Sequence, residues 1–239
     1  MYQMRGQSSQ SCGGTSQGGK RAVRARRPDS RILREMVAKG PLKPLGRAFY
    51  ARPVVEVARA CVGCLLVCRE NGVVVGRIVE SEAYRGPDDR AAHSYAGRRT
   101  ARTEVMFGRA GHAYVFSLYG QHRHLNLVTG SVGQPEAVLI RAVEPIWGLE
   151  IMSERRNVSA DEKVLTNGPG KLCQAFGIDK GHNGRDLTCG GLFLCAGTAG
   201  PIARSPRVGV DYAGPWALRP WRFFERGNRY VSGPARSSR

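Results

Sequence analysis

Residues 73–84, VVVGRIVESEAY, restrict the possible folds of this chain more than any other segment. They are mostly β-branched or apolar and are followed by a Gly-Pro pair, which predicts a β-strand. Because side chains alternate along a strand, Glu80, Glu82 and Tyr84 are expected on one face. With His93 from the following loop, these groups favour a site that binds a flat polar ligand and activates a water. A salt-bridged strand end would carry the same pattern.

The positive charge of the chain is large and is shared between its two parts. The formal net charge is +18 over 239 residues, with +9 in residues 1–47 and +9 in the remainder. The folded part is therefore basic in its own right, which favours a polyanionic partner such as nucleic acid. A general solubility charge or binding to anionic lipid would give the same signal. No apolar run approaches the ~20 residues that span a bilayer, which predicts a soluble protein with no membrane partner.

The cysteine pattern predicts neither disulfides nor a metal site. The chain has seven cysteines and no apolar secretory leader. Cys61, Cys64 and Cys68 have a spacing that suggests zinc, but no second Cys/His pair follows at the required distance. Three more lie in apolar stretches: Cys173, Cys189 and Cys195. We expect small buried thiols, with no metal and no cofactor.

The sequence divides into a basic arm, residues 1–40, and one folded domain, residues 41–235. The arm is rich in Ser, Gly, Gln and Arg and poor in large apolar side chains, which predicts disorder. Three interpretations of the arm fit this composition: an organelle transit peptide, a DNA-contacting tail or an over-extended start site.

The folded part is expected to be α+β: a single mixed domain with a mostly antiparallel curved sheet, flanking helices and a protruding β-hairpin. The expected elements besides the strand 73–84 are a helix running into a strand at 53–68, a charged loop at 85–104, a hairpin at 112–128 with Tyr119 near its tip, a strand at 136–144, a helix at 146–156, a helix opened by residues 168–170, and strands at 192–196, 207–212 and 222–232.

Several short motifs follow one another in a fixed order between residues 46 and 231. They are RIVESEAY at 77–84, AAHS at 91–94, MF at 106–107, AYVF at 113–116, YG at 119–120, LN at 125–126, VLIRA at 138–142, GPGKLCQA at 168–175 and RVGV at 207–210. Together they resemble the alkyladenine (3-methyladenine) DNA glycosylase family of mammalian type, which includes bacterial members. The resemblance implies a monomeric enzyme that flips alkylated or deaminated purines out of duplex DNA and hydrolyses the glycosidic bond, leaving an abasic site.

Within this resemblance, Glu82 matches the carboxylate that deprotonates a bound water, which then attacks C1′ of the damaged nucleotide. Arg141 and the backbone carbonyl of Val208 match the groups that hold this water. Independently of the resemblance, an arginine in the apolar run VLIRAVE needs a carboxylate partner, and Glu82 is the obvious candidate. An ordinary ion pair is the alternative role for Glu82.

Tyr84, His93 and Phe116 match the pocket that stacks against the extruded base. Ring faces suit a cationic alkylated purine, because cation–π attraction adds roughly 1 kcal/mol or more when desolvated. Asn126 matches the pocket residue that discriminates against the exocyclic amine of guanine. The alternative role for Tyr84 and Phe116 is packing in the core, and the alternative for His93 is a histidine that is hydrogen-bonded within its loop. Phe116 departs from the tyrosine that is common in the family, and the lost hydroxyl can shift substrate preference.

Tyr119 matches the wedge that fills the gap left by the flipped nucleotide, although a tyrosine half-packed on the sheet would also suit a turn. Gln121 begins a polar run, QHRH, where the family is more apolar, and is assigned to the DNA with Tyr119. Four basic residues are assigned to the DNA backbone: Arg98, Arg99, Arg102 and, at a glycine-rich helix start, Lys171.

No nucleophilic lysine is evident near the acidic residues, which predicts a monofunctional hydrolase without lyase activity. One rival interpretation is a catalytically silent DNA- or RNA-binding protein of the same fold. A metal-dependent nuclease is disfavoured because the acids near Glu82 form no evident ligand cluster. The expected location is the cytoplasm, at the nucleoid, in a bacterium, and the nucleus or an organelle in a eukaryote.

Overall fold

Two long neighbouring strands, β2 (Val74–Tyr84) and β5 (Glu136–Trp147), form the centre of the structure. A computed structural model describes residues 42–118 and 122–233, so the expected arm at 1–40, Tyr119 and Gln121 lie outside the described residues. The remaining strands of the described part are β1 (Leu65–Cys68), β3 (Ala113–Leu118), β4 (His122–Thr129), β6 (Leu192–Cys195), β7 (Ile202–Ser205) and β8 (Arg222–Glu225). Its α-helices are α2 (Arg47–Tyr50), α3 (Val54–Cys61), α4 (Leu149–Arg156) and α5 (Pro169–Phe176).

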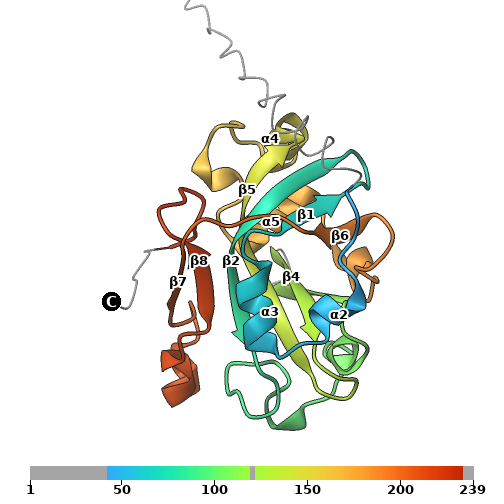
Figure 1. The fold of residues 1–239 in the computed structure, drawn as a ribbon, viewed down its shortest axis with the longest axis vertical. Helices are drawn as coiled ribbons and strands as arrows, with labels where there is room; N and C mark the ends of the chain where they lie inside the picture. The colour runs from blue at the N-terminus through green and yellow to red at the C-terminus, as the bar shows by residue number, and fades with distance from the viewer. Residues whose placement is uncertain (1–41, 119–121, 234–239) are drawn as a thin grey trace, which may run out of the picture.

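The described strands form one antiparallel sheet in the order β3-β4-β5-β2-β1-β6 (Figure 1). The edge of β2 is shared, because its first half pairs with β1 and Glu80–Glu82 pair with β8. β7 extends the sheet beyond β8. The predicted mixed α+β class with a mainly antiparallel sheet and flanking helices is confirmed.

One face of the sheet carries the main hydrophobic core. Helix α3 begins after Pro53 and buries Val54, Val57, Ala58 and Cys61, a spacing that puts all four on one side of the helix. Helix α5 has Pro169 in its first turn. It buries four side chains of its later turns in the same core: Leu172, Cys173, Ala175 and Phe176. Both helices pack against β5, α3 also against β2, and α5 also against β4, so they cover the same face.

The opposite face carries polar and aromatic side chains. Glu82 of β2 pairs with Leu139 of β5, which also pairs with Asn126 of β4. Asn126 pairs in turn with Tyr114 of β3. Directly paired residues in adjacent antiparallel strands point to the same face, so these four side chains form a row across four strands. The neighbouring row, which begins at Ala83, belongs to the main core.

Two irregularities interrupt the pairing of β2 with β5 next to this row. The register passes from Ile78↔Val143 to Glu80↔Ala142 and then to Ser81↔Ile140, which leaves Val79 and Arg141 without a partner. Such β-bulges bend a strand and redirect the side chain of the extra residue. Arg141 lies two residues after Leu139, so strand alternation places it on the face that carries Glu82, and the bulge leaves it without a direct partner in β2.

Some expected elements are wrong or displaced. The strand expected at 207–212 is absent, since β7 ends at Ser205 and residues 207–210 form a loop ahead of a 3-10 helix, Asp211–Leu218. The loop replaces a strand because its backbone and side chains bond to residues near the site, as described below. β8 covers only the start of the strand expected at 222–232, and β5 continues to Trp147, so α4 starts three residues later than expected.

The cysteines of the described part are all free thiols, and the expectation of burial is wrong for Cys189, which is exposed. Burial raises the pKa of the Cys64 thiol to about 11 and that of Cys173 to about 12, so both are neutral. Within residues 42–118 and 122–233, no cluster of three His, Cys, Asp or Glu side chains could hold a metal ion. No helix in those same ranges has the length and apolar character needed to cross a membrane.

Candidate active site

A cavity of about 330 Å³ lies over the polar face of the sheet. Its wall includes Tyr84 from β2, Phe116 from β3, Asn126 from β4 and Arg141 from β5. The loop after β2 adds His93. Two further loops close the sides, one around Val208–Val210 and one at the start of α5. The structure thus brings together in one cavity the residues that the sequence assigned to a base pocket.

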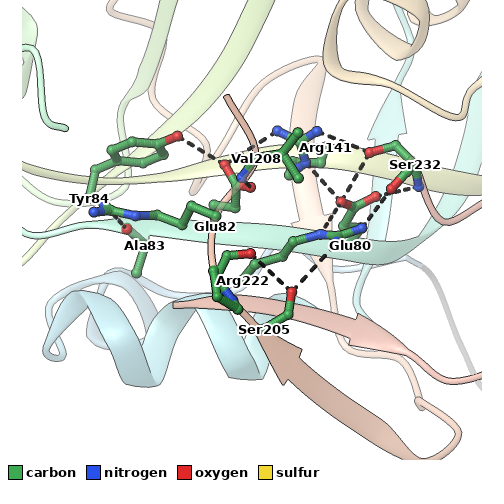
Figure 2. A network of polar contacts seen from close by, with 11 residues as sticks. Glu80, Glu82, Ala83, Tyr84, Arg141, Ser205, Val208, Arg222 and Ser232 are labelled. Carbon is green, nitrogen blue, oxygen red and sulfur yellow. Dashed lines mark hydrogen bonds and ion pairs between the residues drawn. The ribbon is translucent and has the colours of Figure 1, made fainter. Parts of the chain in front are cut away.

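Glu82 is fully buried directly behind this wall, and its carboxylate accepts three hydrogen bonds (Figure 2). Oε1 accepts from the backbone N–H of Val208 at 2.8 Å, and Oε2 from the Tyr84 hydroxyl at 2.9 Å. Arg141 Nη1 lies 3.3 Å from Oε2. The expectation for Val208 concerned its carbonyl, whereas the contact with Glu82 is made by its amide. All three donors come from the cavity lining, so the carboxylate is oriented toward the cavity.

A second buried carboxylate, Glu80, holds Arg141 from behind. Arg141 Nε donates to Glu80 Oε1 at 2.8 Å, and Arg222 Nε donates to the same oxygen at 2.7 Å. Ser232 near the end of the described chain donates its backbone N–H to Glu80 Oε2 at 2.6 Å and accepts from Arg141 Nη2 at 3.1 Å (Figure 2). Two carboxylates and two guanidinium groups therefore form a charge-balanced buried network.

Tyr84 is fixed by a second buried ion pair. The Arg207 guanidinium lies 4.8 Å from the centre of the Tyr84 ring and donates to Asp89 Oδ1 at 2.9 Å. The side chains of Arg207 and Asp89 are both completely buried. Asp89 also accepts from backbone N–H groups in its own loop, at Arg85 and Ala91. This pair ties the loop that carries His93 to the loop that carries Val208, which explains why residues 207–210 leave the sheet.

Burial and the adjacent Glu82 carboxylate raise the pKa of Tyr84 well above its usual value, so that its phenol stays protonated and donates to Glu82. Burial, followed by the positive charge of Arg102, lowers the pKa of His93 to about 4. In a neutral His93, Nε2 accepts a hydrogen bond from Arg102 Nη2 at 3.2 Å, so the ring proton is on Nδ1. Nδ1 donates this proton to the oxygen of the Tyr114 hydroxyl, 3.0 Å away. A neutral ring at this position does not repel a cationic ligand.

His93 and Phe116 form one aromatic wall, with ring centres 4.5 Å apart and planes at 80°. Arg102, which was assigned to the DNA backbone, lies over Phe116 at 4.8 Å and bonds to His93, so it supports this wall. Arg98 is exposed and lines a separate cavity of about 480 Å³ together with Arg90 and Arg102.

The two other basic residues assigned to DNA have partners within the described chain. Arg99 forms an exposed pair with Glu104, Nη2 to Oε1 at 2.6 Å. Lys171 Nζ donates to Asn167 Oδ1 at 2.9 Å at the start of α5. The wedge residue Tyr119 and its neighbour Gln121 lie outside the described residues.

Several site residues were missed by the sequence reasoning. Arg222 is an arginine in an apolar strand, RFFE, and the argument applied to Arg141 would have found it. Ser232 and Asp89 carry no comparable local signal, because their roles depend on partners far away in the chain. His124, in the polar run at the hairpin, has its ring in the cavity wall.

The fold and site define an enzyme-like arrangement in which an aromatic cavity backs onto a buried, hydrogen-bonded carboxylate. The sequence model for methylpurine-DNA glycosylase matches residues 48–229. The chain is 47% identical over 192 residues to a Bacillus licheniformis protein named "Putative 3-methyladenine DNA glycosylase", covering 80% of this chain and 97% of the relative. Relatives with the same name from Desulfitobacterium hafniense and Methanocella arvoryzae are 48% and 50% identical, and cover 80% and 79% of this chain and 99% and 95% of their own length. The chain therefore belongs to the methylpurine-DNA glycosylase family and is a DNA glycosylase, with DNA as its substrate.

Proposed function

We propose that this protein excises alkylated or deaminated purines, 3-methyladenine among them, from duplex DNA. The damaged nucleotide rotates out of the duplex and its base enters the 330 Å³ cavity between Tyr84 and the wall of His93 and Phe116. A water activated by Glu82 attacks C1′ and displaces the base, leaving an abasic site. The relatives' names support the alkylated substrate.

The observation that carries the proposal is the position of the Glu82 carboxylate. It lies behind the cavity wall, and its three donors, Val208, Tyr84 and Arg141, all belong to that wall. A water that enters between Arg141 and Val208 would meet a carboxylate held in one orientation. General-base activation requires this kind of positioned acceptor within hydrogen-bond reach of the water.

The pocket also suits the charge of the proposed substrate. A 3- or 7-alkylated purine is cationic, and ring faces attract cations when both are removed from water. Tyr84 and Phe116 supply such faces, and the low pKa of His93 keeps its ring neutral above about pH 4. The arginine-lined cavity beside the pocket, which shares His93 with it, is suited to the phosphates on either side of the flipped nucleotide.

The test is a base-release assay on duplexes that contain one hypoxanthine or one 1,N6-ethenoadenine. We expect free base together with an intact strand that carries an abasic site, at the same rate with and without EDTA. A catalytically silent binding protein would shift the duplex without releasing base. Strand scission that EDTA stops would indicate a metal-dependent nuclease and would contradict the proposal.

A second prediction concerns the basic arm. Deleting residues 1–40 is expected to weaken binding to undamaged duplex and to reduce the slope of log Kd against log salt, because fewer basic groups displace counterions from the DNA. Base release at saturating enzyme is expected to stay unchanged, since the described residues that line the cavity all lie between 84 and 212. Loss of turnover in the truncated protein would show instead that the arm contributes to the catalytic domain.

A further inference from the structure

Most polar side chains of the cavity lining already make a hydrogen bond within the protein. Five polar side chains of the lining already bond to described residues: Tyr84, His93, Tyr114, Arg141 and Tyr212. Asn126 uses its Nδ2 group on the backbone carbonyls of Tyr114 and His124, at 3.1 and 3.4 Å, which leaves only its acceptor Oδ1 for a ligand. Each of these side chains is therefore already oriented by a partner within the protein.

His124 is the exception. It lies on β4, paired with Phe116 of β3, and the two rings are 5.1 Å apart with planes at 60°. The side chain is half-buried in the cavity wall, and its ring nitrogens make no hydrogen bond to any residue in 42–118 or 122–233. Packing against Phe116 fixes the position of the ring, so the unpaired nitrogens belong to an ordered group.

The His124 ring is neutral, since burial lowers its pKa to about 4 and the positive charges of Arg141 and Arg102 act in the same direction. A neutral imidazole carries one N–H and one acceptor nitrogen. Among the described residues of the lining, His124 is therefore the imidazole whose N–H has no acceptor within the protein, because the N–H of His93 is directed at Tyr114.

We propose that His124 is a specificity-determining residue whose ring N–H donates to a 6-oxo group on the purine base held in the cavity. The inference rests on the proposed function. It assigns to His124 the recognition of deaminated purines such as hypoxanthine, which carry an oxygen at C6. Bases with an amine at C6, such as 3-methyladenine, do not depend on this donor. The unpaired Asn126 Oδ1 is available to them instead.

The test compares single-turnover release of hypoxanthine from a defined duplex with release of 3-methyladenine from methylated DNA. His124→Phe keeps an aromatic ring against Phe116 and removes both nitrogens. We expect hypoxanthine release to fall roughly tenfold, the size of one lost hydrogen bond, and 3-methyladenine release to change less than about twofold. His124→Gln retains an N–H donor and is expected to restore hypoxanthine release to within about threefold of wild type.

His112→Phe is the matched control, because His112 lies at the far end of the same hairpin, outside the cavity, and is expected to change neither rate. Preserved release of 3-methyladenine by His124→Phe also shows that the variant is folded. Equal loss for both bases, or no loss, would overturn the role of His124. A wild-type protein that releases 3-methyladenine but not hypoxanthine would overturn it as well, whereas one that releases no base at all would overturn the proposed function itself.

Discussion

Glu82→Gln is expected to abolish base release while binding to lesion-bearing duplex is retained. An amide has nearly the same shape as the carboxylate; its one oxygen can still accept from the Val208 N–H while its NH2 group faces the Tyr84 hydroxyl oxygen, but it cannot take a proton from water. Loss of a positioned general base typically lowers the rate ~10²–10⁴-fold, so a fall of about 10³-fold or more is expected under single-turnover conditions. Fluorescence anisotropy with a labelled duplex measures the retained binding.

Glu136→Gln is the matched control for this variant. Glu136 begins β5 in the same sheet, is half-buried and lies outside the cavity, so its substitution is expected to leave base release unchanged. Full activity in Glu82→Gln would refute water activation by this carboxylate. A loss of DNA binding that parallels the loss of activity would show that Glu82 acts on binding and not on the chemical step.

Glu80→Gln is expected to produce the largest loss of stability among single substitutions in the site. Glu80 is fully buried and neutralises two buried guanidinium groups, those of Arg141 and Arg222. Removing one partner of a buried ion pair typically costs about 3–5 kcal/mol, because the remaining charge stays buried without compensation. For a domain of this size, that corresponds to a drop in Tm of roughly 6–20 °C, measurable by circular dichroism or calorimetry.

Glu144→Gln provides the comparison for a partly exposed ion pair on the same sheet. Arg77 bonds to both Glu144 and Glu225, and the Glu144 side chain is 34% exposed. Solvent screening and the remaining Glu225 contact limit the expected loss to about 1 kcal/mol. If both variants lose the same stability, burial of the ion pairs does not add to the stability of the network around Glu80.

Glu80→Gln is also expected to slow base release at temperatures where it remains folded, because Arg141 loses its positioning partner.

The local part of the site could be predicted from the sequence, because it depends on neighbouring residues. Alternation along the strand 73–84 put Glu80, Glu82 and Tyr84 together, and all three take part in the site. The expectation that Arg141 needs a buried carboxylate also agrees with its contacts, although it bonds to Glu80 as well as Glu82. The strand expected at 207–212 was wrong for the opposite reason. Its apolar pattern is local, but Arg207 is held by Asp89, 118 residues earlier in the chain.

By itself, then, the sequence determined the strands and helices with strong apolar periodicity, the motif order that marks the family, and the side chains that share one strand face. These follow from backbone geometry and hydrophobic patterning over a few residues. Only the tertiary structure decided which distant groups complete the site. Arg222 and Ser232 reach Glu80 across 142 and 152 residues, and the bulge in β5 leaves Arg141 without a direct partner in β2. Such contacts depend on how strands pair and where a register shifts, and many pairings of the same strands satisfy the same local pattern.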